Sequence, residues 1–335
     1  MRWRRKVVLS SSKNDLKPIS ECALGTTNEG KSVCSTLEGV NAMKKFVESH
    51  KENDTKEKLL QLSLKKAKLT SESELYQNEE FQQLLNHFSP TKNWKSFLQE
   101  LFNPPGPAFT TKAISDGDQA QALQQWTKMA TNASFHPIEF QLLNFMEDSE
   151  QHNALRDFDW KERLNQGYRT FAVLINTATF EDVKACVPGQ SCGIHWTCMF
   201  FDFRNLSSSF SKDVIEDLAK PLPNGAVSTK SCTVEFFNSS GNPPSPFMQL
   251  YFQHVCRYFK TKLPQINLWV VSASLLRQQY SKTECGVWCL YYIFHRLQNV
   301  PFTWFLTTNI DDAVITQFRQ VIFRHDRRIT RSAAS

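Results

Sequence analysis

The sequence lacks any long apolar run. None of its stretches approaches 18 consecutive apolar residues, the length at which a membrane-spanning helix becomes a candidate. A secretion signal is also missing, because the basic start of Met1–Leu9 has an apolar part of only about three residues, followed by Ser-rich sequence. We therefore expect a protein that is neither inserted in a membrane nor secreted.

A disulfide framework is the second absence. The chain has nine cysteines, an odd number, spread over 335 residues without the regular spacing of a disulfide-rich domain. This usage indicates a reducing compartment in which most of the thiols are free.

A convincing metal-ligand pattern is lacking as well. Cys186, Cys192, His195 and Cys198 superficially resemble a zinc set. Ligands three residues apart on one strand point to opposite faces, however, so Cys192, His195 and Cys198 cannot converge on one ion. We therefore expect neither a metal nor another cofactor.

Charge of one sign is in only mild excess. The 39 Lys+Arg minus the 33 Asp+Glu leave a net charge of +6. This excess fits weak contact with DNA or an acidic protein surface, but many proteins with a basic surface have the same balance. The hydrophobic share of 41%, with 26 Phe, predicts a folded protein with a large core.

The chain divides by composition into an arm and a catalytic domain. Residues 1–102 are polar at first and then show charged amphipathic patterns, which predict a partly flexible, mainly helical arm with helices at 41–68, 78–88 and 93–102. The run Asn103–Pro107 is rich in Pro and Gly, which neither a helix nor a central strand tolerates. We place the domain boundary there, so that residues 103–335 form the second domain.

The second domain mixes strands and helices. Short apolar runs predict strands at 170–175, 194–203, 233–237 and 268–271, the first two buried on both faces. Helical patterns fall at 119–130, 137–145, 247–258, 285–297 and 311–323. This alternation predicts an α/β or α+β fold with one central mixed sheet, and we find no internal repeat.

Cys285 stands directly before an apolar helical pattern, Val287–Leu297. A thiol attacks a carbonyl only as thiolate, and the partial positive charge at a helix N-terminus favours the thiolate. Gly286 leaves room for a substrate beside the sulfur. The usual role of a free cysteine is a small core residue, but the neighbouring Gln279 and Glu284 favour a nucleophile.

His195 opens the apolar run that ends at Phe203 and is the candidate base. Asp202 is not its partner, because seven residues of strand separate the two by about 23 Å and place them on opposite faces. Asn238 follows the next strand, where its amide oxygen can accept a hydrogen bond from the imidazole and hold one tautomer. We therefore choose Asn238 as the orienting residue.

Gln279 precedes Cys285 by six residues and lies on the loop leading into its helix. Its amide group can donate to the oxyanion that forms during attack, together with the backbone N–H of Cys285. The adjacent Gln278 offers the same chemistry and stays an alternative.

At these residues the chain resembles the superfamily of viral and SUMO-deconjugating cysteine peptidases, which includes the adenovirus endopeptidase and polyprotein-processing proteases of large DNA viruses. The resemblance covers about 100–325 and is carried most specifically by His195-Trp196, Glu235–Ser239 and Thr283–Gly286. It implies a papain-like catalytic fold in which Trp196 packs beside the site.

The resemblance implies the same four roles: Cys285 as nucleophile, His195 as base, Asn238 as orienting residue and Gln279 in the oxyanion hole. It also implies a viral endopeptidase that cleaves structural polyproteins at Gly-Gly-X sites during virion maturation. Such an enzyme would act in the host cytoplasm, at viral factories, and in the virion.

Two departures and two alternatives remain. Leu206–Lys230 is an insertion of about 25 residues, for which we expect an added surface element, and Asn238 stands where SUMO peptidases usually carry Asp. The same site would serve a deconjugating peptidase for SUMO or ubiquitin-like modifiers. An inactive scaffold is the non-enzymatic alternative.

Overall fold

The computed structural model describes most of residues 103–325. Residues 1–102 and 326–335 lie outside the described part, as do the short gaps 111, 130–131, 133, 148–152, 188–192, 194, 207–211, 224–225, 227–229 and 275. The predicted helical arm, with its helices at 41–68, 78–88 and 93–102, therefore lies outside the described residues.

The chain divides into two compact units, one of Thr110–Phe318 and one of Met1–Phe109 together with Arg319–Ser335. In the described part of the latter unit, β1 (Pro105–Gly106) pairs in parallel with β8 (Arg324–His325). The domain boundary placed between 102 and 103 stays a prediction.

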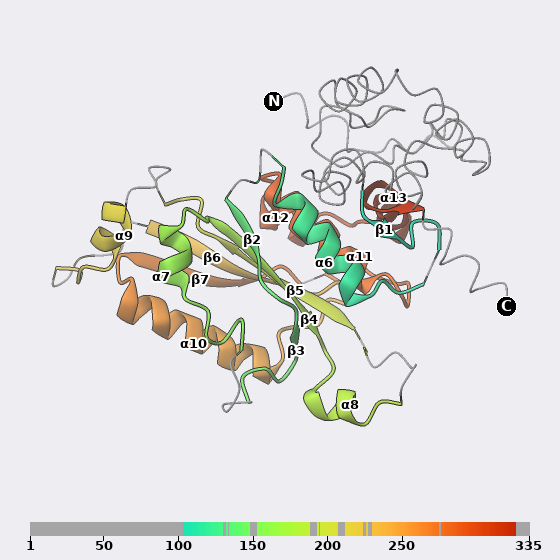
Figure 1. The fold of residues 1–335 in the computed structure, drawn as a ribbon, viewed down its shortest axis with the longest axis horizontal. Helices are drawn as coiled ribbons and strands as arrows, with labels where there is room; N and C mark the ends of the chain where they lie inside the picture. The colour runs from blue at the N-terminus through green and yellow to red at the C-terminus, as the bar shows by residue number, and fades with distance from the viewer. Residues whose placement is uncertain are drawn as a thin grey trace, which may run out of the picture. The chain divides into compact units, whose positions relative to one another are not determined.

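The unit Thr110–Phe318 is built on a six-stranded mixed sheet (Figure 1). Strand order is β2–β4–β5–β6–β7, and β3 also pairs with β4. The strands are β2 (Phe135–Pro137), β3 (Gln141–Leu142), β4 (Thr170–Asn176), β5 (Trp196–Asp202), β6 (Lys230–Phe237) and β7 (Ile266–Ser272). β5 is antiparallel to both of its neighbours, whereas β2 and β3 run parallel to β4, and β7 runs parallel to β6. The expected class, α/β with one central mixed sheet, is confirmed.

Helices cover both faces of this sheet. The described helices are α6 (Asp116–Trp126), α7 (Trp160–Asn165), α8 (Phe180–Lys184), α9 (Lys212–Leu218), α10 (Pro246–Lys262), α11 (Cys285–Leu297), α12 (Phe302–Thr307) and α13 (Asp312–Ile322). Figure 1 shows α10 on one side of the sheet, and α6 with α11 on the other. The sheet is thus the middle layer of three.

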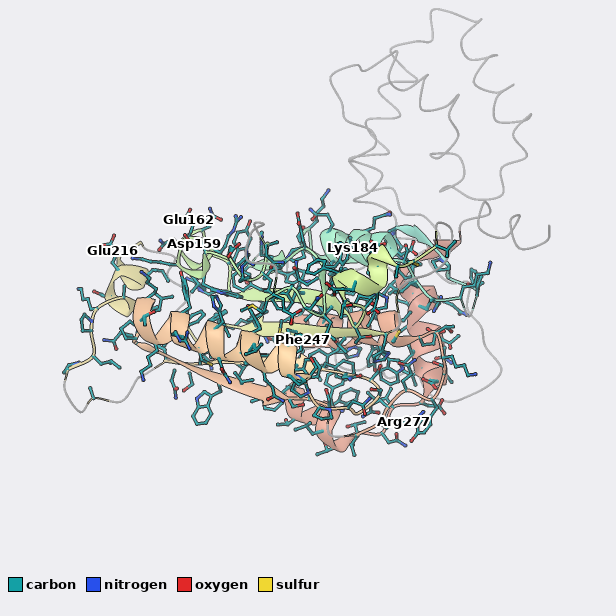
Figure 2. All side chains as sticks on the ribbon, turned by 90° about the horizontal axis from the view of Figure 1, so that it is seen from below. Asp159, Glu162, Lys184, Glu216, Phe247 and Arg277 are labelled. Atoms are coloured by element: carbon teal, nitrogen blue, oxygen red, sulfur yellow. The ribbon has the colours of Figure 1, made fainter. Side chains whose placement is uncertain are left out.

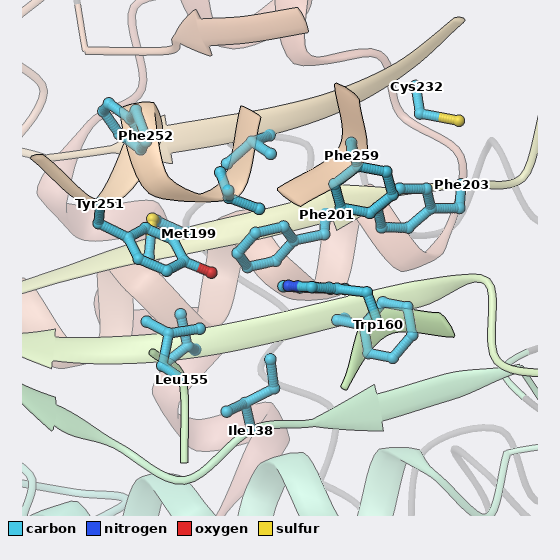
Figure 3. Close-up of a cluster of buried hydrophobic side chains, with 14 of the residues drawn as sticks. Ile138, Leu155, Trp160, Met199, Phe201, Phe203, Cys232, Tyr251, Phe252 and Phe259 are labelled. Atoms are coloured by element: carbon cyan, nitrogen blue, oxygen red, sulfur yellow. The ribbon is translucent and has the colours of Figure 1, made fainter. Parts of the chain in front are cut away.

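The main core lies between the sheet and α10 (Figure 3). Alternate residues of β5, Met199 and Phe201, point into it and meet Tyr251 and Phe259 of α10. Trp160 of α7 completes this aromatic cluster, with its ring 4.6 Å from that of Phe201. The intervening residues of β5 face α11, which explains why the sequence of this strand is apolar without alternation.

Most of the predicted elements are confirmed. The four predicted strands correspond to β4, β5, β6 and β7, and the helices predicted at 119–130, 247–258, 285–297 and 311–323 correspond to α6, α10, α11 and α13. The start of α10 is set by Ser245, whose side chain caps the backbone N–H of Met248, with Pro246 in the first turn.

The helix predicted at 137–145 is wrong. This segment contributes β3 and the end of β2, both paired with β4, and then turns. The backbone N–H of Ile138 donates to the carbonyl of Ala172 at 2.8 Å, so pairing with a distant strand decides the local conformation. A mixed run of apolar and polar residues of this length suits either element, and the tertiary contact overrides the helical pattern.

The insertion is more than the expected surface element. Its helix α9 places Ile215 and Leu218 in the main core, where they are 1% and 6% exposed. α9 also packs against α7. The inserted residues therefore contribute to the stability of the domain.

Free thiols prevail among the described cysteines: Cys198, Cys232, Cys256, Cys285 and Cys289 are unpaired, whereas Cys186 is disulfide-bonded. Across the same part of the chain, no helix is both long and apolar enough to cross a bilayer.

A buried ion-pair network joins α11 to the sheet. Arg296 forms a two-pronged pair with Glu235, with Nε–Oε2 and Nη2–Oε1 distances of 2.6 and 2.7 Å, and its Nη2 lies 2.8 Å from Asp202 Oδ2. Tyr292 donates its hydroxyl to Glu235 at 2.7 Å. Glu235 is fully buried, so its carboxylate depends on these partners.

Replacing Arg296 with Met should lower the free energy of unfolding by about 3–5 kcal/mol, because Glu235 is left as an uncompensated buried charge. Urea denaturation followed by tryptophan fluorescence measures this change. Lys220→Met is the matched control, since Lys220 pairs with Asp217 on the surface, and its denaturation midpoint should not move. Equal midpoints for the two variants would contradict the structural role of Arg296.

Candidate active site

Cys285 is the first residue of α11 and is 6% exposed. The N-cap residue, Glu284, makes no side-chain cap hydrogen bond. The first backbone N–H groups of the helix are therefore available to a negative charge at the sulfur or at a bound substrate. Gly286 lets the helix pack tightly, because a Cβ there would lie 2.7 Å from Cγ1 of Ile114.

Helix α11 packs along strand β5, and residues near the start of the helix lie beside residues near the start of the strand. The backbone N–H of Trp196 lowers the pKa of the Cys285 thiol and therefore lies near its sulfur, and Cys198 Sγ lies 3.8 Å from the carbonyl oxygen of Cys289. Two strand residues span about 6.6 Å and four helical residues about 6 Å, so both contacts fit one alignment. Because His195 directly precedes Trp196, its backbone lies at the same end of β5 as the start of α11.

His195 bonds Asn238 at the site, with 2.8 Å between Nε2 and Oδ1. The same Oδ1 accepts the backbone N–H of Ser240 at 3.0 Å, which only an oxygen could do, so the orientation of the Asn238 amide is fixed. Nε2 of His195 must then carry the proton of this bond. In the neutral form of the ring, Nδ1 is then the nitrogen that can accept a proton.

The sheet explains why these two residues meet. β5 and β6 are antiparallel, with Cys198 opposite Phe237. The beginning of β5 therefore lies beside the end of β6, where His195 and Asn238 are placed. The exclusion of Asp202 agrees with the structure, because Asp202 ends β5 and pairs with Arg204 and Arg296.

Burial dominates the electrostatics of the thiol. It raises the pKa of Cys285 to about 11, although backbone N–H groups of Trp196, Gly286 and Cys285 itself lower it. The backbone donors at the helix start do favour the thiolate, as expected, but desolvation outweighs them. The thiol is therefore mostly protonated at neutral pH unless a base takes its proton.

Gln279 has a fixed amide group. Its Nε2 donates to the carbonyl of Ser281 at 2.7 Å, and its Oε1 accepts the hydroxyl of Ser239 at 2.7 Å. A carbonyl only accepts, so the nitrogen end of the amide is identified, and this nitrogen has a second N–H for another acceptor. Ser239 is a partner of this amide that the sequence did not reveal.

The side chain of Gln278, the alternative to Gln279, makes hydrogen bonds to the segment Phe305–Ile310. Its Nε2 donates to the carbonyls of Phe305 and Thr308, and its Oε1 accepts the backbone N–H of Ile310. With both ends of its amide engaged and 1% of the residue exposed, Gln278 supports the fold.

Aromatic side chains border the site. The ring of Trp196, which directly follows His195, lies 6.1 Å from that of Phe140 in an edge-on arrangement, and Phe140 is exposed. On the loop before Cys285, the guanidinium of Arg277 lies 4.9 Å from the centre of the Tyr280 ring. Figure 2 shows Arg277 at the surface. Among the described residues, no group of three or more His, Cys, Asp or Glu is arranged to hold a metal.

A cysteine at the start of a buried helix and a histidine–asparagine pair at the adjoining sheet edge define a cysteine peptidase. The chain is homologous to cysteine proteases of African swine fever virus. It is 26% identical over 241 residues to the SUMO-1 cysteine protease of a Kenyan pig isolate, a match covering 68% of this chain and 73% of the relative. The cysteine protease of a Malawian tick isolate is 27% identical over 240 residues, with the same coverage.

A solved structure shows the same fold. The crystal structure of an African swine fever virus protease has a TM-score of 0.62 to this chain at 21% identity, covering 92% of this chain and 96% of the other. No protein-family model matches the chain.

Burial holds the pKa of the Cys285 thiol at about 11 with His195 in place, so we expect reaction near pH 7 to depend on transfer of the thiol proton to His195. Replacing His195 with Ala removes this acceptor, and alkylation of Cys285 by iodoacetamide at pH 7 should slow by tenfold or more. Its rate should then climb steadily up to about pH 11.

Mass spectrometry of the Cys285 peptide after timed alkylation gives this pH profile. Cys256, a partly exposed thiol in α10, serves as the internal control, and its profile should be the same in both proteins. Superimposable Cys285 profiles for wild type and His195→Ala would refute the coupling between the two residues.

Proposed function

We propose that this chain is a viral endopeptidase that cleaves structural polyproteins at Gly-Gly-X sites during virion maturation. The observation that carries the proposal is the hydrogen bond between His195 and Asn238, at the end of β5 along which the helix of Cys285 packs. Similarity to cysteine proteases of African swine fever virus supports the viral assignment. The enzyme would act in the host cytoplasm, at viral factories, and in the virion.

The first chemical step is proton transfer and attack. His195 Nδ1 takes the proton of the Cys285 thiol, and Asn238 holds the ring through Nε2 as charge develops on it. The thiolate forms a bond to the scissile carbonyl carbon, while the π electrons of the carbonyl move to its oxygen. The backbone N–H of Cys285 and the second N–H of Gln279 Nε2 would stabilise this oxyanion.

The second step releases the products. The tetrahedral intermediate collapses, the C–N bond breaks, and the proton on His195 Nδ1 passes to the leaving nitrogen. Water then gives a proton to His195 Nδ1 and attacks the carbonyl carbon of the thioester. The C–S bond breaks, the acid is released, and the sulfur takes the proton back from Nδ1, which regenerates the thiol. No external oxidant, reductant or metal enters this sequence.

The preference for Gly-Gly-X sites is what the resemblance to viral maturation proteases implies. Trp196, which belongs to the motif that carries this resemblance, packs edge-on against the exposed ring of Phe140 at 6.1 Å.

Deconjugation of ubiquitin-like modifiers is the second candidate. The name of the Kenyan-isolate relative, a SUMO-1 cysteine protease, favours it. Both candidates use the same nucleophile. They differ in what precedes the Gly-Gly sequence in the substrate, which is a folded modifier in one case and a polyprotein segment in the other.

The test is cleavage of a fluorogenic peptide with a Gly-Gly-X site by the full chain, with Cys285→Ser and Asn238→Ala as variants. Wild type should cleave after the second glycine, the Cys285→Ser variant should be inactive, and Asn238→Ala should lose at least tenfold in kcat. A peptide in which Ala replaces the second glycine is the matched substrate control and should be cleaved at least tenfold more slowly.

Undiminished cleavage by Cys285→Ser, or equal cleavage of the alanine peptide, would overturn the proposal. A SUMO vinyl sulfone probe separates the two candidates. Rapid labelling of Cys285 by this probe at micromolar concentration would replace the polyprotein assignment with the deconjugase, whereas absence of labelling in a peptide-cleaving enzyme supports the polyprotein assignment.

A further inference from the structure

Asp312, the first residue of α13, gathers three hydrogen bonds on its carboxylate. Its Oδ2 accepts the backbone N–H groups of Tyr280 and Ser281 at 2.9 and 2.7 Å. Its Oδ1 accepts the indole N–H of Trp288 at 3.1 Å. A carboxylate suits this position because it has two acceptor oxygens and no donor.

These bonds join two segments that the chemistry requires in register. Tyr280 and Ser281 belong to the loop between Gln279 and Cys285, whereas Trp288 lies one turn into α11. Asp312 therefore fixes the loop relative to the helix that carries the nucleophile. Hydrogen bonds to a charged acceptor are roughly twice as strong as those between neutral groups, so the carboxylate holds the loop residues Tyr280 and Ser281 firmly in place.

Ser281 passes this restraint on to Gln279. Its backbone N–H is held by Asp312, and its carbonyl accepts Nε2 of Gln279 at 2.7 Å. At the other end of the same amide, Oε1 of Gln279 accepts the hydroxyl of Ser239, which is fully buried. The Gln279 amide is thus held between two anchors, and Asp312 fixes one of them.

We propose that Asp312 is a positioning residue for the oxyanion hole: it sets the place of the Gln279 amide relative to Cys285 without touching the substrate. The inference rests on the role proposed for Gln279 and adds a residue 27 positions beyond the nucleophile in sequence.

The test combines turnover with thiol reactivity in Asp312→Ala. On the Gly-Gly-X peptide, kcat should fall about 10- to 100-fold, less than or similar to the 10²–10³ that loss of an oxyanion donor costs, while KM changes less than threefold. Iodoacetamide alkylation of Cys285 should keep its wild-type rate, because that reaction forms a C–S bond and expels iodide without creating an oxyanion.

Asp311→Ala is the matched control. Asp311 is exposed, and its Oδ1 accepts the backbone N–H of Ala313 at 2.8 Å at the start of the same helix. Its loss weakens the beginning of α13 without touching the loop, so kcat should stay within twofold of wild type. An equal loss of kcat in both variants would overturn the inference, because the effect would then come from the helix start.

A double-mutant cycle tests the geometry itself. In Asp312→Asn the remaining oxygen can serve the loop, but the new NH₂ group faces the indole N–H of Trp288, so donor meets donor. Adding Trp288→Phe removes this clash, and Asp312→Asn should then cost less kcat than it costs in wild type. A cost as large in the Trp288→Phe background as in wild type would overturn the arrangement.

The outcomes separate this inference from the proposed function. Failure of wild type to cleave the peptide, or cleavage by Cys285→Ser, would remove the proposed function. Wild-type kcat in Asp312→Ala, or alkylation of Cys285 that falls in step with kcat, would remove only the role of Asp312.

Discussion

The alignment of α11 along β5 is the constraint on which the site depends. Toward the start of the helix, Cys198 Sγ lies 3.8 Å from the carbonyl oxygen of Cys289, and at its end Arg296 bonds Asp202 and Glu235. Every residue of α11 is buried, so the helix cannot slide without exposing or overpacking a side chain. A rigid mount of this kind suits a nucleophile, which loses rate when it is misplaced by even about 1 Å.

Strand β5 therefore serves two purposes. Its first end adjoins His195 and the thiol, while its last residue, Asp202, belongs to the ion-pair network. Burial raises the pKa of Asp202. The hydrogen bonds and charge of Arg204, together with the charge of Arg296, lower it by more, so the net shift is downward. An ionised Asp202 is thus a structural anion, and the neutral amide of Asn238 is left to orient the imidazole.

Much of the fold was predictable because its central elements have unambiguous local patterns. β4, β5, α10 and α11 are continuous apolar or amphipathic runs, and the placement of His195 and Asn238 follows from adjacent strand ends. The segment 137–145 was not predictable, since its strands exist only by pairing with β4. Ser239 and Asp312 were missed for a similar reason. Their contacts to Gln279 and Ser281 span 40 and 31 residues, so the neighbouring sequence did not show which residues they hold. The raised pKa of Cys285 could not be predicted either, because its main cause is the burial of the thiol in the folded state.

The most direct test of the central claim is detection of the covalent intermediate. A peptide ester ending in Gly-Gly, mixed with the full chain and quenched in acid within the first turnover, should add the mass of its acyl group to the protein. Digestion and mass spectrometry should place this mass on the peptide that contains Cys285. Turnover with the acyl group on another residue, or with none detectable under conditions where its hydrolysis is slow, would contradict the account.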